Sequence, residues 1–271
     1  MKKLKAIGEC VLYFAIFSLT PVVCFFIFAL LNLLLDITKT NIKMSSGFLW
    51  KIFSCILIII ICYLISKRKQ INFVKEIKFN KIPIISMILL LLLGISVVIS
   101  FAFVLDNISN IFPALRKFAE SNSSETEIPT GALEKTFMFI AVCIFVPITE
   151  EIIFRSYIFS TLEKAFPKII AYILVVTIFA VLHGDLLTII SVLVNGGLLI
   201  WVFERYNSVV ANALVHAGMN LIITIVNMVT LDSDKIATFI GVSSVFVFVI
   251  SIICIYINTK NVQIRGETQK V

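Results

Sequence analysis

Two adjacent carboxylates and an arginine stand where the surrounding sequence is almost wholly apolar. Glu150, Glu151 and Arg155 follow the apolar run from Phe137 to Ile148. Ionisable groups in such surroundings usually face a water-filled or protein-lined cavity and have a function. On a helix, Glu151 and Arg155 lie at i and i+4 on one face, whereas Glu150 points about 100° away. We therefore expect a structural ion pair, and beside it a carboxylate, Glu150, that has no obvious local partner and is available for chemistry. The alternative is that both glutamates mark a helix end at the headgroup level.

Only two histidines occur in the chain, and both lie in or beside apolar segments of its second half. One belongs to a polar series on a single helical face, with steps of four, four, four and three: Asn212, His216, Asn220, Thr224 and Asn227. A second series follows the other histidine, His183, with steps of three, three and four: Asp185, Thr188, Ser191 and Asn195. Either series could serve only to hydrogen-bond helices together, and we favour that interpretation for the second. For the first we favour a functional role, because a titratable imidazole with an amide one turn away is more than packing requires.

These residue types suit hydrolysis of a peptide bond by an activated water. A carboxylate in an apolar pocket has a raised proton affinity and suits a general base, and a nearby imidazole can help to deprotonate the water. A second histidine with an amide one turn away offers donors to the oxyanion. No G-x-S-x-G turn marks a nucleophilic serine, and no cysteine lies near a histidine in sequence. Two glutamates and two histidines could hold zinc, but the H-E-x-x-H motif is missing, so we expect no metal and no other cofactor.

The composition places these residues in an integral membrane protein. Hydrophobic residues make up 60% of the 271 and charged residues 14%, against about half and a quarter in soluble domains. The net charge of +7 could indicate nucleic-acid binding, but the basic residues flank apolar segments, where they set topology, and we expect no nucleic-acid partner. The six cysteines form no C-x-x-C pair, so neither a disulfide framework nor a zinc site is indicated.

We predict an all-α fold, a polytopic membrane helical bundle of about eight transmembrane helices, because a spanning helix needs about 20 apolar residues. Eight segments approach this length, the second and fifth being short: Ile7–Leu35, Ile52–Ser66, Ile82–Leu105, Phe137–Phe159, Ile169–Leu182, Leu186–Phe203, Ser208–Leu231 and Ile236–Asn258. If the lysine-rich N-terminus is cytoplasmic, most of the 23 basic residues flank cytoplasmic span ends. Both termini are therefore expected in the cytoplasm, and the polar loop 106–136 outside. The first apolar run lacks a small-residue cleavage site, so we interpret it as a span rather than a signal peptide.

Three short motifs of the second half carry a family resemblance. Glu150-Glu151-x-x-x-Arg155, Phe179-x-x-x-His183 and His216-x-x-x-Asn220, in this order on separate spans, resemble those of the CAAX protease and bacteriocin-processing (CPBP) family. The best-known member of that family is the type II CAAX prenyl endopeptidase, and the resemblance covers about Phe137 to Asn227.

The resemblance implies an intramembrane glutamic endopeptidase. Glu150 and His183 would activate the water, and His216 and Asn220 would form the oxyanion hole. Glu151 and Arg155 would support the first motif, and Phe179 would shape the wall of the site. The chain would then comprise an N-terminal membrane-spanning region of about three helices with the external loop (1–133), a catalytic helical core (134–258) and a basic cytoplasmic tail (259–271).

The expected substrate is a membrane-associated peptide or protein within the lipid bilayer. Resemblance to the CAAX endopeptidase implies cleavage next to a prenylated cysteine, whereas prokaryotic relatives are linked to peptide maturation, bacteriocin self-immunity or processing of membrane proteins. The richness in Ile, Lys and Asn favours a bacterial cell membrane and this second group. The alternative function is a non-catalytic bacteriocin-immunity or ligand-binding membrane protein whose polar series line a cavity. The sequence does not indicate an oligomeric state.

Overall fold

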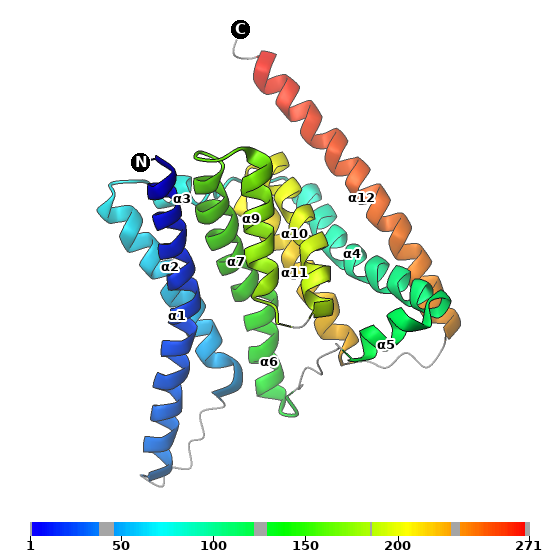
Figure 1. The fold of residues 1–271 in the computed structure, drawn as a ribbon, viewed down its shortest axis with the longest axis horizontal. Helices are drawn as coiled ribbons and strands as arrows, with labels where there is room; N and C mark the ends of the chain where they lie inside the picture. The colour runs from blue at the N-terminus through cyan, green and yellow to red at the C-terminus, as the bar shows by residue number, and fades with distance from the viewer. Residues whose placement is uncertain (1, 38–45, 122–128, 185, 229–233, 269–271) are drawn as a thin grey trace. The chain divides into compact units, whose positions relative to one another are not determined.

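The computed structural model describes residues 2–37, 46–121, 129–184, 186–228 and 234–268, and every regular element in these stretches is helical (Figure 1). In chain order the elements are α1 (Lys2–Ile37), α2 (Ser46–Arg68), α3 (Phe73–Glu76), α4 (Ile84–Ile111), α5 (Pro113–Ser121), α6 (Ala132–Ile140), η1 (Ala141–Phe145), α7 (Val146–Glu151), η2 (Ile152–Phe159), α8 (Ser160–Leu162), α9 (Lys168–Val181), α10 (Leu186–Tyr206), α11 (Val209–Val226) and α12 (Asp234–Thr268). The η elements are π-helical. The all-α prediction is confirmed.

Seven of the eight expected spans correspond to helices long and apolar enough to cross a membrane. They are α1, α2, α4, the continuous run Ala132–Leu162, α10, α11 and α12. The fifth expected span is α9, whose 14 residues reach roughly 21 Å at 1.5 Å per residue, less than the hydrocarbon thickness of about 30 Å. The chain is thus a polytopic helical membrane protein with one short apolar helix in its second half.

The outer surface of the bundle explains why these helices require lipid. Along α1, large apolar side chains such as Leu19, Phe26 and Leu30 are 62%, 65% and 57% exposed. A helix that is hydrophobic on all sides is stable only where apolar surroundings cover it, and protein covers only part of α1. In lipid, every backbone polar group must also be satisfied within the chain, which favours helix throughout.

The chain divides into two compact units, each formed from two separate stretches. Unit 1 comprises Met1–Phe79 and Glu127–Val175, and unit 2 comprises Asn80–Thr126 and Val176–Val271. Unit 1 therefore carries the first motif, and unit 2 carries the other two. The division at residues 133 and 258 made from the motifs concerns function and stays a prediction.

Unit 1 is built on α1 and α2. α1 packs against α2, η2 and α8, and α2 also contacts α6, η1 and α7. Aromatic pairs fix α1 to η2, since Tyr13 stacks on Tyr157 with ring centroids 4.1 Å apart and Phe17 meets Phe154 edge-on at 5.1 Å.

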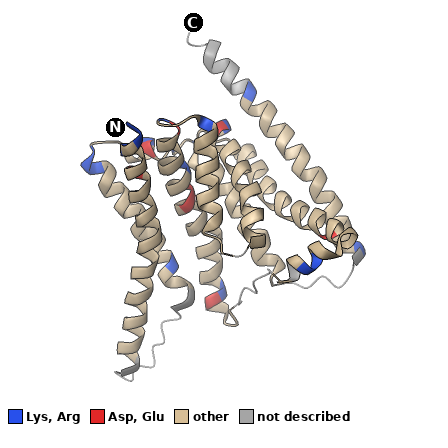
Figure 2. Cartoon of the chain, in the orientation of Figure 1, with Lys and Arg blue, Asp and Glu red and all other residues tan. Residues whose placement is uncertain are grey.

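The basic segments of unit 1 gather at the end where α1 begins (Figure 2). Lys3 Nζ lies 5.6 Å from the centre of the Phe166 ring, and Lys69 Nζ lies 3.6 Å from a carboxylate oxygen of Glu9. These contacts bring the N-terminus, the segment after α2 and the segment before α9 together. Such a grouping is what the positive-inside rule expects of one membrane face, and the assignment of that face to the cytoplasm stays a prediction.

In unit 2, α4 packs against both α11 and α12, and α10 contacts α11. The backbones of α4 and α11 approach so closely at Gly94 that a Cβ atom there would lie 2.0 Å from the carbonyl oxygen of Val215. At Gly218, a Cβ would lie 2.5 Å from the carbonyl oxygen of Leu91. Small residues at a crossing permit this close packing of membrane helices. The buried core around it is apolar: Leu90, Leu93, Val97, Leu199, Val202, Ala211, Val215, Met219 and Ile255.

Candidate active site

The first motif lies on a helix that is widened on both sides. η1 precedes α7 and η2 follows it, so the chain changes from π to α and back to π around the glutamates. Pro147 has no N–H, and its ring would clash with the carbonyl four residues earlier in a regular α-helix. The Val146 N–H bonds instead to the carbonyl of Ala141, five residues back. Such π-helical turns occur frequently at functional sites.

Glu151 and Arg155 form the ion pair that their spacing predicts. Arg155 Nε lies 3.1 Å from Glu151 Oε2, and the two side chains are 1% and 0% exposed. Two fully buried charges are tolerable only when they neutralise each other with good geometry. The pair therefore fixes the widened helix internally rather than marking a helix end at the headgroup level.

Glu150 differs from its neighbour in burial but is not isolated from the pair. Its side chain is half-buried, whereas that of Glu151 is fully buried. Its carboxylate also interacts electrostatically with the Arg155 guanidinium. The expectation that Glu150 has no local partner is therefore wrong. The accessible carboxylate is still that of Glu150.

The second motif occupies the end of α9 and the turn after it. His183 Nδ1 lies 2.8 Å from the carbonyl oxygen of Phe179, one of the last four carbonyls of the helix, which have no partner within it. A carbonyl oxygen only accepts, so Nδ1 carries the proton of this bond. In the neutral ring, Nε2 is then the acceptor. Gly184 follows with φ of +91°, a conformation that favours glycine and turns the chain away from the helix.

The histidines and the amide of the second and third motifs meet at one cavity of unit 2. This cavity has a volume of about 350 Å³ and is enclosed by α4, α9, α10 and α11. His183, His216 and Asn220 all line it, together with Phe179. The Phe179 ring contacts both imidazoles edge-on, with its centroid 4.8 Å from that of His183 and 6.0 Å from that of His216. An edge-on aromatic ring thus sets the position of both histidines.

The polar series on α11 divides between the cavity and the protein core. Asn212 is completely buried and donates from Nδ2 to the carbonyl oxygen of Leu199 at 2.7 Å, which ties α11 to α10. Thr224 Oγ1 donates to the carbonyl oxygen of Asn220 at 2.7 Å. Only His216 and Asn220 of this series line the cavity. Asn212 therefore has a structural role at one end of the series, and His216 and Asn220 in its middle face the cavity.

The polar series on α10, for which the sequence favoured helix packing alone, also reaches the cavity. Thr188, Ser191 and Asn195 line the same cavity as the histidines, while Asp185 is outside the described residues. Asn195 Nδ2 donates to Ser191 Oγ at 3.4 Å. The spacing of three, three and four residues carried this signal, but spacing alone does not distinguish a cavity wall from helix packing.

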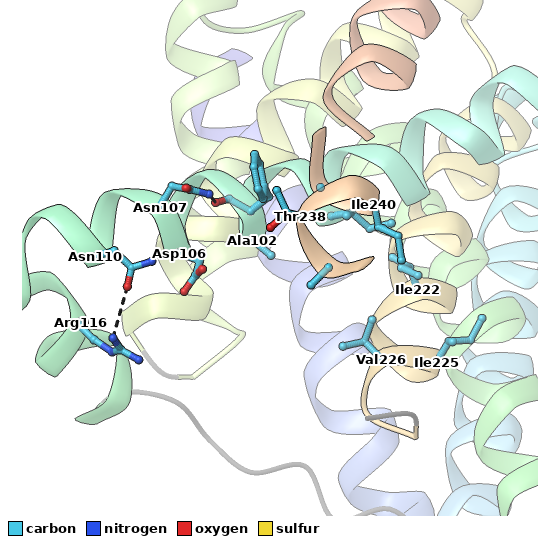
Figure 3. A pocket seen from close by; sticks show the side chains of 14 residues that line it. Ala102, Asp106, Asn107, Asn110, Arg116, Ile222, Ile225, Val226, Thr238 and Ile240 are labelled. Atoms are coloured by element: carbon cyan, nitrogen blue, oxygen red, sulfur yellow. Dashed lines mark hydrogen bonds between the residues drawn. The ribbon is translucent and has the colours of Figure 1, made fainter. Parts of the chain in front are cut away.

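A larger cavity of unit 2 lies beyond the α4–α11 pair, among α4, α5, α11 and α12 (Figure 3). It has a volume of about 900 Å³, and its polar side includes Asp106 and an Arg116 Nη1 to Asn110 Oδ1 hydrogen bond of 3.3 Å. The opposite wall is apolar, with Ile222, Ile225 and Val226. None of the described residues that line it is a histidine or belongs to the three motifs. Cavity volume alone therefore does not identify the candidate active site.

The structure thus brings Phe179, His183, His216 and Asn220 together in unit 2, and Glu150, Glu151 and Arg155 together in unit 1. Within neither unit do three histidine, cysteine or carboxylate side chains of the described residues group closely enough to hold a metal ion. The roles of the individual residues stay predictions.

The part of the chain that carries the three motifs is similar to known proteins. Residues 132–222 match the family model described as type II CAAX prenyl endopeptidase Rce1-like. UPF0177 protein YxdF of Lactococcus lactis subsp. lactis (strain IL1403) is 33% identical over 79 residues, which are 29% of this chain and 43% of that protein. UPF0177 protein YbdI of the same strain is 29% identical over 147 residues, 52% of this chain and 77% of that protein.

The chain thus spans less than half of the first of these curated relatives, and neither name states an activity. No solved structure matches the chain. The family match contains all three motifs, from Glu150 to Asn220. Segment 132–222 of the chain is therefore similar to the Rce1-like type II CAAX prenyl endopeptidases.

Proposed function

We propose that the protein is an intramembrane endopeptidase that hydrolyses a peptide bond with a water activated by Glu150 and His183. The observation that carries the proposal is the unit 2 cavity, where His183, His216 and Asn220 converge around Phe179. All of these residues, and Glu150, belong to the segment that matches the endopeptidase family.

In the proposed reaction, the Glu150 carboxylate takes a proton from the water while the water oxygen adds to the substrate carbonyl. His183 assists through Nε2, which accepts because Nδ1 donates to the Phe179 carbonyl. His216 and Asn220 donate hydrogen bonds to the oxyanion of the tetrahedral intermediate. The proton held by Glu150 then passes to the leaving amine as the peptide bond breaks. Glu151 and Arg155 hold the helix that carries the first motif in place and do not react.

The proposed substrate is a membrane-associated peptide or protein, either a prenylated chain end or a peptide precursor. A cavity of about 350 Å³ is at the small end of ligand sites. It would therefore admit a short extended segment rather than a folded domain. Both relatives come from a bacterium, which supports a bacterial cell membrane as the location.

The test is cleavage of a panel of prenylated and membrane-anchored peptides by the purified protein in lipid, with products identified by mass spectrometry. Glu150→Gln should abolish product formation and keep peptide binding, because it removes the base and preserves the shape. Glu134→Gln, a carboxylate at the start of the same run of helices, is the matched control and should cleave like wild type. Equal cleavage by wild type and Glu150→Gln would overturn the proposed mechanism.

The alternative of a non-catalytic immunity or ligand-binding protein gives a different pattern. In that case neither protein forms a product, and Glu150→Gln changes the affinity for the peptide. Measuring binding alongside cleavage therefore distinguishes an enzyme with an untested substrate from a protein that only binds.

A further inference from the structure

A further cavity with a polar lining lies in unit 1. Figure 2 shows the basic segments that gather at this end of unit 1. Its volume is about 760 Å³, and it is formed by the first turns of α1, the segment after α2, α3 and the end of the run from η2 to α8. Five lysines and two glutamates line it: Lys5, Lys69, Lys75, Lys78, Lys164, Glu9 and Glu76. No residue of the three motifs is among the described residues that line it, so it is separate from the candidate active site.

Positive charge is in excess around this cavity. Lys69 pairs with Glu9 at 3.6 Å, and Lys78 pairs with Glu163 at 3.9 Å. The other three lysines, Lys5, Lys75 and Lys164, form no ion pair with any residue that the structure describes. Several like charges around a concave surface raise the local concentration of an anion.

The wall behind these lysines is held in place by hydrogen bonds. The Glu76 carboxylate accepts from the hydroxyl of Ser66 and, at 3.2 Å, from that of Tyr157. Ser156 Oγ donates to the carbonyl oxygen of Ile77 at 2.8 Å. These bonds fix α3 and the residues after it against α2 and η2. The cavity is therefore formed before any ligand arrives, which reduces the ordering cost of binding.

The floor of the cavity is formed by two tyrosines. Tyr13 and Tyr157 stack there at 4.1 Å. Tyr13 is 1% exposed, and its hydroxyl makes no hydrogen bond with the described residues. A buried hydroxyl without a partner costs free energy.

We propose that this cavity binds a phosphate group, supplied by the headgroup of an anionic phospholipid. From Lys5 to Tyr13 the cavity extends about 12 Å along α1, which is deeper than the headgroup layer of one leaflet. A phospholipid would place its phosphate among the lysines and its glycerol and upper acyl chains against the tyrosines. Free phosphate shares the charged contacts but would fill only the lysine-lined part of the cavity. The proposal does not depend on the proteolytic function.

The test measures binding of dihexanoyl phosphatidylglycerol, dihexanoyl phosphatidylcholine and inorganic phosphate to the full chain in neutral detergent by titration calorimetry. Lys75→Gln/Lys164→Gln removes two of the unpaired charges. Lys81→Gln/Lys260→Gln, which removes two exposed lysines of unit 2, is the control with the same change in net charge. The melting temperature of each variant shows whether it is folded.

Wild type should bind phosphatidylglycerol more tightly than phosphatidylcholine. The Lys75/Lys164 variant should bind it about 25-fold more weakly, at about fivefold for each lysine, and the control should bind like wild type. Tight, lysine-dependent binding of inorganic phosphate would support the same site with the soluble anion as its source. An equal loss in both double variants, or equal affinity for the two lipids, would overturn the proposal, because the lysines would then act only as a general basic surface.

Discussion

Removal of the Arg155 guanidinium should destabilise the protein strongly, because it leaves the Glu151 carboxylate charged and fully buried. We consider Arg155→Met, which keeps most of the side-chain volume. The two charges approach to 3.1 Å and are 1% and 0% exposed. At that distance and an effective dielectric constant of about 20, their attraction is roughly 5 kcal/mol. Losing one partner of a buried pair typically costs about 3–5 kcal/mol.

The assay is thermal unfolding of the purified variants in one detergent, with cleavage activity measured on the folded fraction. A loss of about 4 kcal/mol corresponds to a melting temperature lower by roughly 8–16 °C for a chain of this size. The double variant Glu151→Leu/Arg155→Met should recover most of this loss, because replacing both charges by apolar groups removes the unpaired charge.

The two variants together separate a buried ion pair from a simple packing role. If the arginine contributed only volume, Arg155→Met would be nearly neutral and the double variant no more stable than the single one. A folded, fully active Arg155→Met protein that melts like wild type would refute the structural role assigned to the pair.

Three further predictions use matched residues. Gly94→Ala should destabilise the protein by about 1–3 kcal/mol and lower its melting temperature, because the added Cβ would lie 2.0 Å from a backbone carbonyl of α11. Gly197→Ala in α10, where a Cβ meets nothing within 4 Å, is the control and should be neutral or stabilising. Equal melting temperatures of the two variants would contradict the close crossing of α4 and α11. Asn212→Ala should cost about 1–3 kcal/mol of stability, because it removes the hydrogen bond to the Leu199 carbonyl. Asn220→Ala should keep the melting temperature and lower the cleavage rate by about 10²–10³-fold. The opposite pattern would contradict the roles assigned to the two amides. Cleavage should persist in a chelator; complete inhibition that zinc reverses, with the fold intact, would establish a metal enzyme instead.

The sequence predicted what depends on local spacing. The apolar segments gave the helices because each must satisfy its own backbone in lipid, and the i, i+4 spacing of Glu151 and Arg155 gave their ion pair. The convergence of His183 with His216 was expected from the chemistry that these side chains suit and from the family resemblance. It depends on how α9 and α11 pack in unit 2, which no periodicity records.

Features that arise from contacts between distant segments were not predictable in this way. The two π-helical stretches around α7 depend on one proline and on packing against α1 and α2, while the residue pattern there suits an ordinary helix. Glu76 lies in a polar segment after α2, and nothing local indicates that it meets the hydroxyls of Ser66 and Tyr157. Both features involve contacts between segments far apart in sequence.

The shortness of α9 provides a physical reason for a cavity at His183. If Lys168 lies at the headgroup level, the helix ends after roughly 21 Å, and the turn at His183 and Gly184 would then lie within the hydrocarbon depth. Non-helical backbone is tolerated there only where protein buries it or where it lines a water-filled cavity. At this turn, His183 Nδ1 satisfies the Phe179 carbonyl, and the His183 ring lines the unit 2 cavity. Under the proposed function, the cavity beside this interruption of the helix is where the reacting water would lie.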